Sequence, residues 1–485
     1  MSSATTNRRA KGTLNISAVG PRFGSTKLAA AAIRNALTLA LLSALLLIAA
    51  RPAQAQTETV LYNFTGGADG SHPDTSLISD GAGNFYGATE LGGLGCPGNQ
   101  YGCGVVFELS PNGSGGWNET VLHSFSGPPD AANPIFAPVV FDRVGNLYGT
   151  TGYGGWDNLG ALYELSPAGA SWTEAVLYSF GTDWYYPTAG LIMDSAGNLY
   201  GTTVWGGDGN CGTVFEMSPS GGGWTEQVIY SPYCPAGSAG LIMDAAGNIL
   251  GAAASTVFEL SPNGNGGWNP TVIHTFAGAP KDGYDAAGVP VLDHAGNLYG
   301  TTYYGGAKNL GTVYRLSPIT KGKKKGQWKE TILHSFRGGK DGANPVAGVV
   351  LDAAGNIYGT TFYGGKSGVG TVFELMPQVG KGSYKEKVLW AFNGTDGMLP
   401  YGLPILDSAG NLYGTAARGR IVRERRCVRS DSVGCTPTCA PRRLKVRDTR
   451  IVHVGSTSPR PTSSLGGVFV WLGSSPCRTQ RVGNW

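Results

Sequence analysis

One eight-residue pattern returns seven times along the chain: Asp, two variable residues, Gly-Asn, a hydrophobic residue, usually Tyr, and Gly. The copies begin at Asp80, Asp142, Asp194, Asp244, Asp293, Asp352 and Asp407, with spacings of 62, 52, 50, 49, 59 and 55 residues. Each period holds four short strand-like runs. A repeat of about 50 residues built in this way is typical of a β-propeller blade. The repeat therefore predicts one closed all-β domain, although length alone would suggest about three domains.

The sixth copy illustrates the expected blade. A short apolar strand over 347–352 leads into the turn, and a second strand covers 356–361. A third strand with alternating apolar residues is expected over 370–375 and a fourth over 387–392. In the turn, Asp accepts backbone hydrogen bonds and Gly supplies a positive φ. We prefer this structural interpretation to a calcium loop, which needs more oxygen ligands than the Ala and Ser inside the turn supply.

The two ends of the repeat region predict how the ring closes. The region begins with a strand of the fourth type, Val60–Phe64, and ends with strands of the first and second types, 403–407 and 411–415. Joined into one blade, they complete a seven-bladed β-propeller of four-stranded blades and remove the exposed edges of a linear array. The third strand of this blade is not evident after Thr415. Either 467–472 supplies it, or residues 417–485 are a disordered basic tail or an out-of-frame translation.

Charge is sorted along the chain and divides it into three parts. Residues 1–55 hold seven Lys/Arg and no acid, and residues 417–485 hold fourteen Lys/Arg and three acids. The repeat region, 56–416, therefore carries a net charge of −14. A domain this acidic repels phosphate backbones, so we expect no nucleic-acid partner.

The first 55 residues have the features of a signal peptide with a long basic leader. An apolar run over 36–50 is followed by Ala53-Gln54-Ala55, a small-x-small cleavage site. The run is shorter than the roughly 20 residues of a membrane span, so we expect no stable transmembrane span after cleavage. The sequence therefore predicts a protein that is secreted or located at the cell surface or in the periplasm. We also expect it to be a monomer.

Export permits disulfides, and two pairs of cysteines are placed to form them. Cys96 and Cys103 lie in one predicted loop, and Cys211 and Cys234 lie in loops expected on the same face. Three histidines, at 123, 274 and 334, fill a strand position that Tyr or Trp fills in other repeats. A position open to His, Tyr and Trp indicates packing, so we predict no catalytic residue, metal site or cofactor.

The candidate binding face carries the loops that vary between repeats. In a propeller the loops between second and third strands share one face with the loops between blades, and variable loops on a rigid scaffold carry function. The candidate ligand-binding residues there are Tyr153, Trp156, Asp157, Trp184, Trp205, Asp208, Tyr303, Tyr304 and Tyr363. Aromatic faces beside carboxylates suit sugar rings. The expected partner is therefore a glycan or a surface protein.

The consensus G-L-x-x-D-x-x-G-N-L-Y-G-T-T, extended to a V-F-x-L-x-P strand, closely resembles the GloVer tandem repeat of bacterial exported proteins. The stretches 191–219 and 349–377 match it nearly throughout, and the resemblance covers 57–416. It implies export and a propeller-like array rather than a reaction. The turn is also similar to that of lactonase-type propellers, which hold a metal at the ring centre with Glu, Asn and Asp. A metal-dependent hydrolase is therefore the alternative to a binding module, although no such set of three residues stands out.

Overall fold

The computed structural model describes residues 56–231, 240–253 and 255–418, with short strands at 421–422, 445–446, 449–456 and 469–470. The predicted signal peptide, Cys234 and most of the predicted tail lie outside the described residues. The only helical elements among the described residues are two 3-10 turns, η1 (Asp208–Asn210) and η2 (Gly339–Asp341). None of these residues forms a helix that could cross a lipid bilayer.

Six antiparallel sheets each follow the chain from a first to a fourth strand, as the repeat predicts. The first sheet is β2 (Ile78–Ser79), β3 (Phe85–Thr89), β4 (Val105–Pro111) and β5 (Trp117–Ser124). The second is β7 (Val140–Phe141), β8 (Leu147–Thr151), β10 (Ala161–Ala168) and β11 (Ser171–Ser179). The third is β13 (Ile192–Met193), β14 (Leu199–Gly206), β15 (Thr213–Ser220) and β16 (Gly223–Tyr230).

The remaining three of these sheets have the same order. The fourth sheet is β17 (Leu241–Met243), β18 (Ile249–Ala253), β19 (Thr256–Pro262) and β20 (Trp268–Thr275). The fifth is β21 (Gly283–Leu292), β22 (Leu298–Gly305), β23 (Thr312–Pro318) and β24 (Trp328–Ser335). The sixth is β25 (Val350–Leu351), β26 (Ile357–Thr361), β27 (Thr371–Pro377) and β28 (Tyr384–Ala391), close to the four expected ranges.

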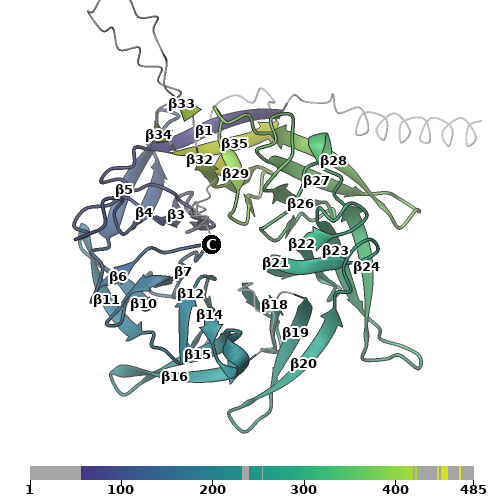
Figure 1. The fold of residues 1–485 in the computed structure, drawn as a ribbon, viewed down its shortest axis with the longest axis horizontal. Helices are drawn as coiled ribbons and strands as arrows, with labels where there is room; N and C mark the ends of the chain where they lie inside the picture. Colours follow the sequence, from purple (N-terminus) through teal and green to yellow (C-terminus); the bar gives the residue numbers. More distant parts are fainter. Residues whose placement is uncertain are drawn as a thin grey trace, which may run out of the picture. The chain divides into compact units, whose positions relative to one another are not determined.

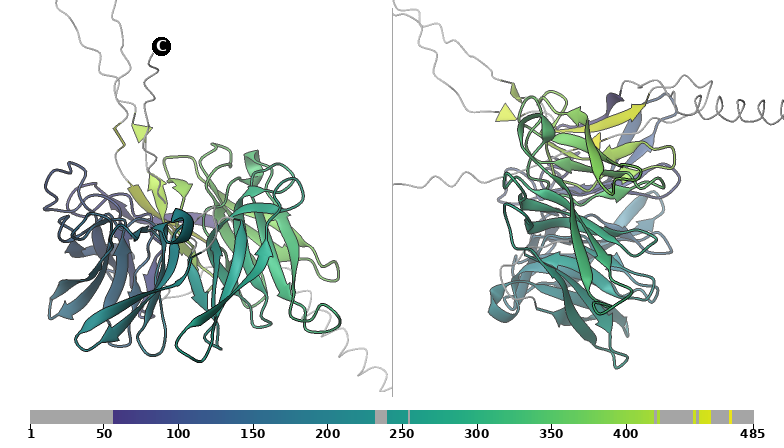
Figure 2. Two further views of the ribbon diagram at one scale, coloured as in Figure 1. Left: turned by 60° about the horizontal axis from the view of Figure 1, so that its bottom comes forward. Right: turned by 90° about the vertical axis from the view of Figure 1, so that its right-hand side faces the viewer.

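The sheets are arranged as the blades of a β-propeller. Figure 1 shows the sheets of residues 56–418 radiating from a common centre, with the fourth strands β5, β11, β16, β20, β24 and β28 on the outside. Figure 2 shows the loops gathered at opposite ends of the strands. The predicted fold class, all-β with a propeller arrangement, is confirmed.

A further sheet combines the first strand of the described chain with strands from its end. This sheet does not confirm the predicted count of seven blades. Six blades come from consecutive strands among the described residues. The mixed sheet has the order β1 (Gln56–Phe64), β35 (Thr449–Ser456), β31 (Leu412–Gly414) and β30 (Ile405–Leu406). The strand that lies between β31 and β1 is thus β35. The range 467–472, expected to supply the third strand of this blade, contains β36 (Phe469–Val470), which pairs with β35 instead.

Side chains from the two ends of the repeat region share one core. Phe64 of β1 and Tyr413 of β31 are buried in the same cluster as Phe85 and Phe107 of the first sheet. The rings of Phe85 and Tyr413 lie 4.5 Å apart. The two ends of the array therefore pack against each other, as a closed ring requires.

The repeated turn is held by its aspartate in the way the sequence predicts. Oδ1 of Asp194 accepts hydrogen bonds from the backbone N–H groups of Ala196 (2.8 Å) and Asn198 (2.9 Å). Its Oδ2 accepts from Nδ2 of Asn198 (2.8 Å) and from the Tyr200 hydroxyl (3.2 Å). These contacts explain why Asn and Tyr recur with Asp in the pattern.

Each blade core is built on a glycine that faces an aromatic ring. A Cβ on Gly201 of β14 would lie 2.5 Å from Cζ of Phe215 in β15. The glycines of the other second strands face Phe107, Tyr163, Phe258, Tyr314 and Phe373 in the same way. The glycine of the motif Tyr-Gly-Thr therefore makes room for the ring of the next strand.

The two sets of variable loops share one face, as predicted. Short strands from the loops between blades pair with the loops between second and third strands: β6 (Ala131–Ala132) with β9 (Tyr153–Gly154), and β12 (Trp184–Pro187) with β14. β29 (Met398–Pro400) pairs likewise with β32 (Ala416–Arg418), and β33 (Ile421–Val422) pairs with β34 (Lys445–Val446). This pairing holds the two loop sets together around one end of the central opening of the propeller. This end is the mouth of the ring.

Candidate functional site

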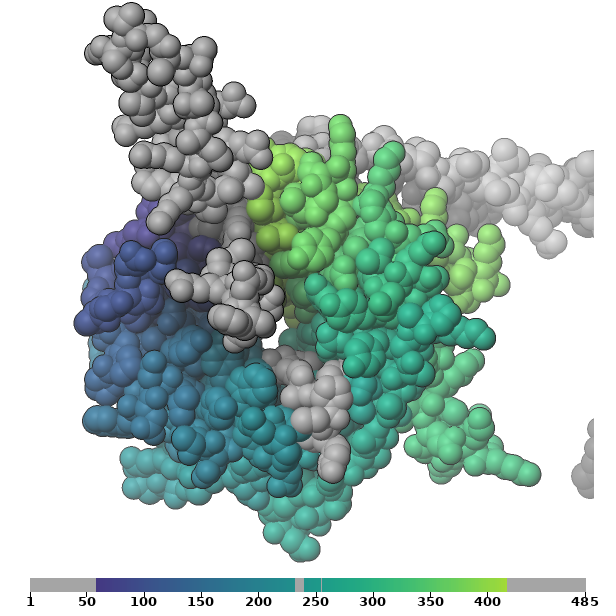
Figure 3. Space-filling view, viewed as in Figure 1, coloured from purple at the N-terminus to yellow at the C-terminus, as the bar shows by residue number. Residues whose placement is uncertain are grey.

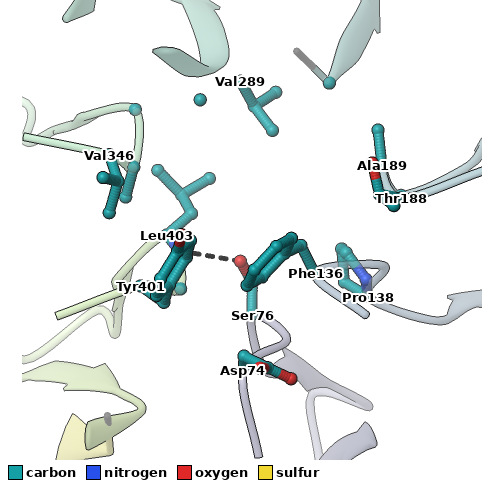
Figure 4. A pocket seen from close by; sticks show the side chains of 16 residues that line it. Asp74, Ser76, Phe136, Pro138, Thr188, Ala189, Val289, Val346, Tyr401 and Leu403 are labelled. Carbon is teal, nitrogen blue, oxygen red and sulfur yellow. Dashed lines mark hydrogen bonds between the residues drawn. The ribbon is translucent and has the colours of Figure 1, made fainter. Parts of the chain in front are cut away.

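The sheets enclose a hollow near the ring centre on the face seen in Figure 3. A cavity of about 120 Å³ lies there, lined by residues just before each first strand. Figure 4 shows side chains from several sheets facing this space. The position six residues before the turn aspartate contributes Asp74, Phe136, Thr188, Val346 and Tyr401. One position of the repeat thus presents five different side chains, from five sheets, to a common cavity.

Aromatic rings from three sheets meet beside the cavity, and two of them, Phe136 and Tyr401, line it. The rings of Phe136 and Tyr401 are stacked, with centroids 4.2 Å apart and planes 12° apart. Phe362 meets Tyr401 edge to face at 5.2 Å. The sheets that carry Phe136 and Tyr401 flank the sheet of Asp74, so the stacked pair lies beside that residue (Figure 4). Half-buried rings of this kind offer an apolar surface to a ligand.

Two acids that break the repeat lie together in the first sheet. Asp74 is 1% exposed, and neither of its carboxylate oxygens has a hydrogen-bond partner among the described residues. Glu90 lies beside it, at the position where other repeats have Gly152, Val204 or Phe362. Burial and the neighbouring Glu90 carboxylate raise the pKa of Asp74 well above its usual range. Asp74 therefore keeps its proton to a higher pH than an ordinary carboxyl and is able to donate a hydrogen bond.

A second cavity of about 330 Å³ adjoins the first and shares Val346 and Tyr401 with it. Asp285, Tyr303 and Tyr304 are among its lining residues. Burial raises the pKa of Asp285. Burial, with the nearby hydroxyls of Tyr363 and Tyr304 and the carboxylate of Asp285, raises the pKa of Tyr303 to about 12. At neutral pH this side of the mouth therefore offers phenol hydroxyls beside a carboxyl.

The loops that lead into the cavity hold non-glycine residues in the left-handed backbone region. These residues are His72, Asn133, Tyr186, Asp285, Asn344 and Leu399, with φ between 55° and 63°. Each such residue, apart from Asn, costs about 1–3 kcal/mol of strain, and such positions are concentrated at functional sites. The strain is therefore a second, independent feature of the same loops.

The predicted ligand-binding residues fall into three places. Tyr303 and Tyr304 line the second cavity, and Tyr363 lies beside Phe362, with ring centroids 4.7 Å apart. The outer residues are exposed: Trp156 (79%), Trp205 (43%), Tyr153, Asp157 and Asp208. Trp184 is only 8% exposed, because its ring packs against Tyr178, Phe180 and Phe215.

Disulfides form in two of the variable loops. Cys96 and Cys103 are bonded, with Cα atoms 5.5 Å apart, as predicted. Cys211 is also disulfide-bonded, and its predicted partner, Cys234, lies outside the described residues.

Sequence reasoning missed the residues at the centre of the mouth. Asp74, Glu90, Phe136 and Tyr401 were not among the predicted candidates, although a signal for the two acids is present. When the repeats are aligned on their turn aspartates, Asp74 and Glu90, like Asp285 of the second cavity, are acids that replace neutral residues of the other described blades. These acids stand out only when the repeats are aligned, and not when the variable loops are compared by length.

The sequence profile of the Gloeobacter/Verrucomicrobia repeat matches the chain twice, over residues 95–255 and 236–424. The chain belongs to this family. The resemblance expected from the Gly-Asn-Leu-Tyr-Gly repeats is thereby confirmed, and the matched regions of the Gloeobacter/Verrucomicrobia repeat include most of the propeller. No curated protein matches the chain.

Several solved structures share the propeller fold of this Gloeobacter/Verrucomicrobia repeat protein. A putative 6-phosphogluconolactonase from Bacteroides uniformis is 14% identical over 70% of this chain and 88% of its own, with a TM-score of 0.44. A streptogramin B lyase is 14% identical over 74% and 94%, with a TM-score of 0.46. A virginiamycin B lyase from Staphylococcus aureus, solved with quinupristin, is 12% identical over 74% and 95%, with a TM-score of 0.45. These likenesses concern the fold and carry no argument about function.

Proposed function

We propose that the protein is an exported binding module that takes a carbohydrate at the mouth of its central cavity. The observation that carries the proposal is the meeting of two stacked aromatic rings with the Asp74 carboxyl in one cavity, with the Glu90 carboxyl beside Asp74. Sugar C–H faces pack on aromatic rings, and sugar hydroxyls pair with carboxyl groups. In this proposal residues 1–55 direct export, the mixed sheet acts as a seventh blade, and the protein works as a secreted or cell-surface monomer.

The chemistry of the mouth favours a neutral sugar. The repeat region carries a net charge of −14, which opposes an anionic polymer. Asp74 and Glu90 lie beside one another, so an anionic group would meet two carboxyls there. A neutral ring that stacks on Tyr401 and donates hydroxyl hydrogen bonds to these acids suits both conditions.

Binding of the full chain to a panel of neutral oligosaccharides, followed by calorimetric titration of the best ligand, tests the proposal. Tyr401→Ala removes the stacking partner and Asp74→Asn removes the carboxyl. Each variant is expected to weaken binding up to about 10-fold, because a neutral hydrogen bond and a stacked ring each contribute roughly 0.5–1.5 kcal/mol. Trp156→Ala is the matched control, because this ring is exposed away from the mouth. Equal affinity of Tyr401→Ala, Asp74→Asn and the unaltered chain would refute the proposal.

The alternative function is a lactonase-like, metal-dependent hydrolase at the same mouth. Asp74 and Glu90 supply two carboxyls near the ring centre, as such a site needs. Among the described residues, however, no third His, Cys, Asp or Glu side chain converges on this pair. The residues therefore do not fit a three-ligand metal, and binding remains the preferred function. Hydrolysis of a lactone panel that is lost in Asp74→Asn would reverse this preference.

A further inference from the structure

The junctions between blades hold a recurring set of polar side chains outside the candidate site. On the outer strands, His123, His274 and His334 occupy the position that Tyr62, Tyr178, Tyr230 and Trp390 fill elsewhere. The structure adds an acidic partner to this position. An aspartate from the loop after the strand, Asp130, Asp282 or Asp341, faces each histidine.

In two of these junctions a glutamate from the next blade completes a set of three. His123 and Asp130 meet Glu174 of β11, and His274 and Asp282 meet Glu330 of β24. Within each set, one ligand atom from each residue lies within 4.8 Å of the others. The Nε2 of His274 is 3.9 Å from Asp282 and 3.7 Å from Glu330, and His123 is 3.7 Å from Asp130.

The converging atoms are buried but do not satisfy one another. Nε2 of His123, Nε2 of His274 and one oxygen each of Glu174 and Glu330 are shielded from solvent and have no hydrogen-bond partner in the part of the chain that the structure describes. Buried polar atoms without partners are destabilising, so a cation bound at the centre of each set would be favoured.

Two other junctions contain a direct contact at hydrogen-bond distance at this position, although one oxygen each of Glu119 and Glu386 beside them also has no hydrogen-bond partner among the described residues. The Tyr62 hydroxyl donates to Asp69 at 3.2 Å, and His334 lies 3.0 Å from Asp341, within hydrogen-bond distance. The packing role predicted for this strand position accounts for these junctions. It does not account for the two sets whose atoms stand 3.7–3.9 Å apart.

We propose that the His123–Asp130–Glu174 and His274–Asp282–Glu330 sets each bind a Zn²⁺ ion that links neighbouring blades. Zinc binds imidazole nitrogen and carboxylate oxygen with bond lengths of about 2.0–2.2 Å. In a tetrahedral site, bonds of this length place the ligand atoms about 3.3–3.6 Å from one another. The three measured histidine–carboxylate separations of 3.7–3.9 Å need only a small contraction to reach this range, and all ligand-atom separations within each set are below 4.8 Å. Calcium takes six to eight oxygens and magnesium a regular oxygen octahedron, so neither suits a set with one imidazole.

The aspartates are already oriented for this role. Asp130 accepts hydrogen bonds from the Ser126 N–H (2.7 Å), the Ser126 hydroxyl (2.8 Å) and the Ala131 N–H (2.6 Å). Asp282 accepts from the N–H groups of Ala277 and Gly283, both at 2.6 Å. Such outer contacts fix a ligating side chain in place.

An open cavity leads to the first set. It has a volume of about 620 Å³, and its lining includes Asp130, Glu174 and the exposed Trp156. Three protein ligands leave a fourth position for water, as in zinc sites open to solvent. The first site is therefore reachable without unfolding the junction.

Zinc content after loading with ZnCl₂ and desalting, measured on the untagged full chain, tests the proposal. We expect two more zinc ions per chain in the unaltered protein than in the double variant His123→Tyr/His274→Tyr. Each single variant should lose one ion. Tyrosine is the natural occupant of this position in other junctions, so these changes preserve the packing. His334→Tyr is the matched control and should lose none.

Glu174→Gln and Glu330→Gln test the same sets without altering the histidines, and each should also lose one ion. Zinc should raise the thermal unfolding midpoint of the unaltered chain and leave that of the double variant unchanged. Equal zinc content in the unaltered chain and the double variant would overturn the proposal. So would loss of zinc in His334→Tyr equal to that in His123→Tyr.

Discussion

At the scale of single residues, the turn aspartate links the repeat to its fold. Its two oxygens accept four hydrogen bonds in the turn at Asp194, from two backbone N–H groups, an amide and a phenol. In the equivalent turn, burial alone would raise the pKa of Asp293, but hydrogen bonds from Asn297, Tyr299 and the Ala295 N–H outweigh it and lower the pKa. One side chain therefore fixes both the backbone of the turn and the side chains around it.

Replacing Asp194 by Ala should lower the free energy of unfolding by about 2 kcal/mol, because several donors lose their acceptor. Urea denaturation followed by tryptophan fluorescence measures the change. Ser195→Ala is the control, since this neighbouring side chain is exposed and should have almost no effect. Equal stability of the two variants would show that the turn does not depend on its aspartate.

At the scale of strands and sheets, the core of each blade depends on a glycine, because glycine has no side chain beyond a hydrogen atom. Gly201 gives space to the ring of Phe215, and the same pair recurs in the other blades. Fourth strands also meet second strands of the preceding blade across the junctions, where Trp224 of β16 lies against Tyr148 of β8 and Trp268 of β20 lies against Tyr200 of β14. These two tryptophans therefore pack between neighbouring blades.

Gly201→Ala should destabilise the protein by about 1–3 kcal/mol, because the added methyl group overlaps the Phe215 ring. Phe215→Leu removes the clashing atom, so the double variant should be more stable than the two single costs together predict. A double-mutant cycle from denaturation curves measures this coupling. Strict additivity would contradict the proposed steric conflict.

The junction at Glu119 predicts a dependence of stability on pH. Burial and the nearby Asp69 carboxylate raise the pKa of Glu119 to about 7, against about 4.3 in an unfolded chain. The folded protein therefore binds the proton more tightly, and the stability from this group is lost as pH rises from about 4.5 to 7. Melting curves between pH 5 and pH 8 should show the unaltered protein losing stability relative to Glu119→Gln. A constant difference between the two proteins would contradict this expectation.

At the scale of the whole molecule, the ring is closed by contacts between distant segments. The Leu403 N–H donates to the Ser76 hydroxyl at 2.7 Å, and the Thr415 hydroxyl donates to the carbonyl of Thr75 at 3.1 Å. In the mixed sheet, β35 separates β31 from β1. The strand that completes this sheet therefore comes from the stretch that the sequence interpretation set apart.

Ending the chain after Arg418 tests whether the mixed sheet is a seventh blade. The deletion removes β35 and leaves the edges of β1 and β31 without the partner they now have. A loss on the order of 5 kcal/mol in urea denaturation is expected, from roughly 1 kcal/mol for each net backbone hydrogen bond. Unchanged stability would mean that residues beyond 418 add nothing to the ring.

The fold was largely predictable because the repeat combines local signals that agree. Asp and Gly specify the turn, alternating residues such as those of 371–375 specify the third strand, and the period specifies the ring. The site was less predictable because Phe136, Tyr401 and Asp74 meet only through the closure of the ring. Trp184 is a related case, since its loop sequence alone does not distinguish an exposed ring from one packed on Phe215.

The position six residues before each turn aspartate carries the acid of Asp74, the rings of Phe136 and Tyr401, the hydroxyl of Thr188 and the methyl groups of Val346 on one backbone frame. Within this one chain, the same position thus takes five different side chains while the turn pattern beneath it is repeated. Randomising these five residues together should yield variants that still fold but bind different ligands. The propeller is therefore a suitable scaffold for engineered binding proteins.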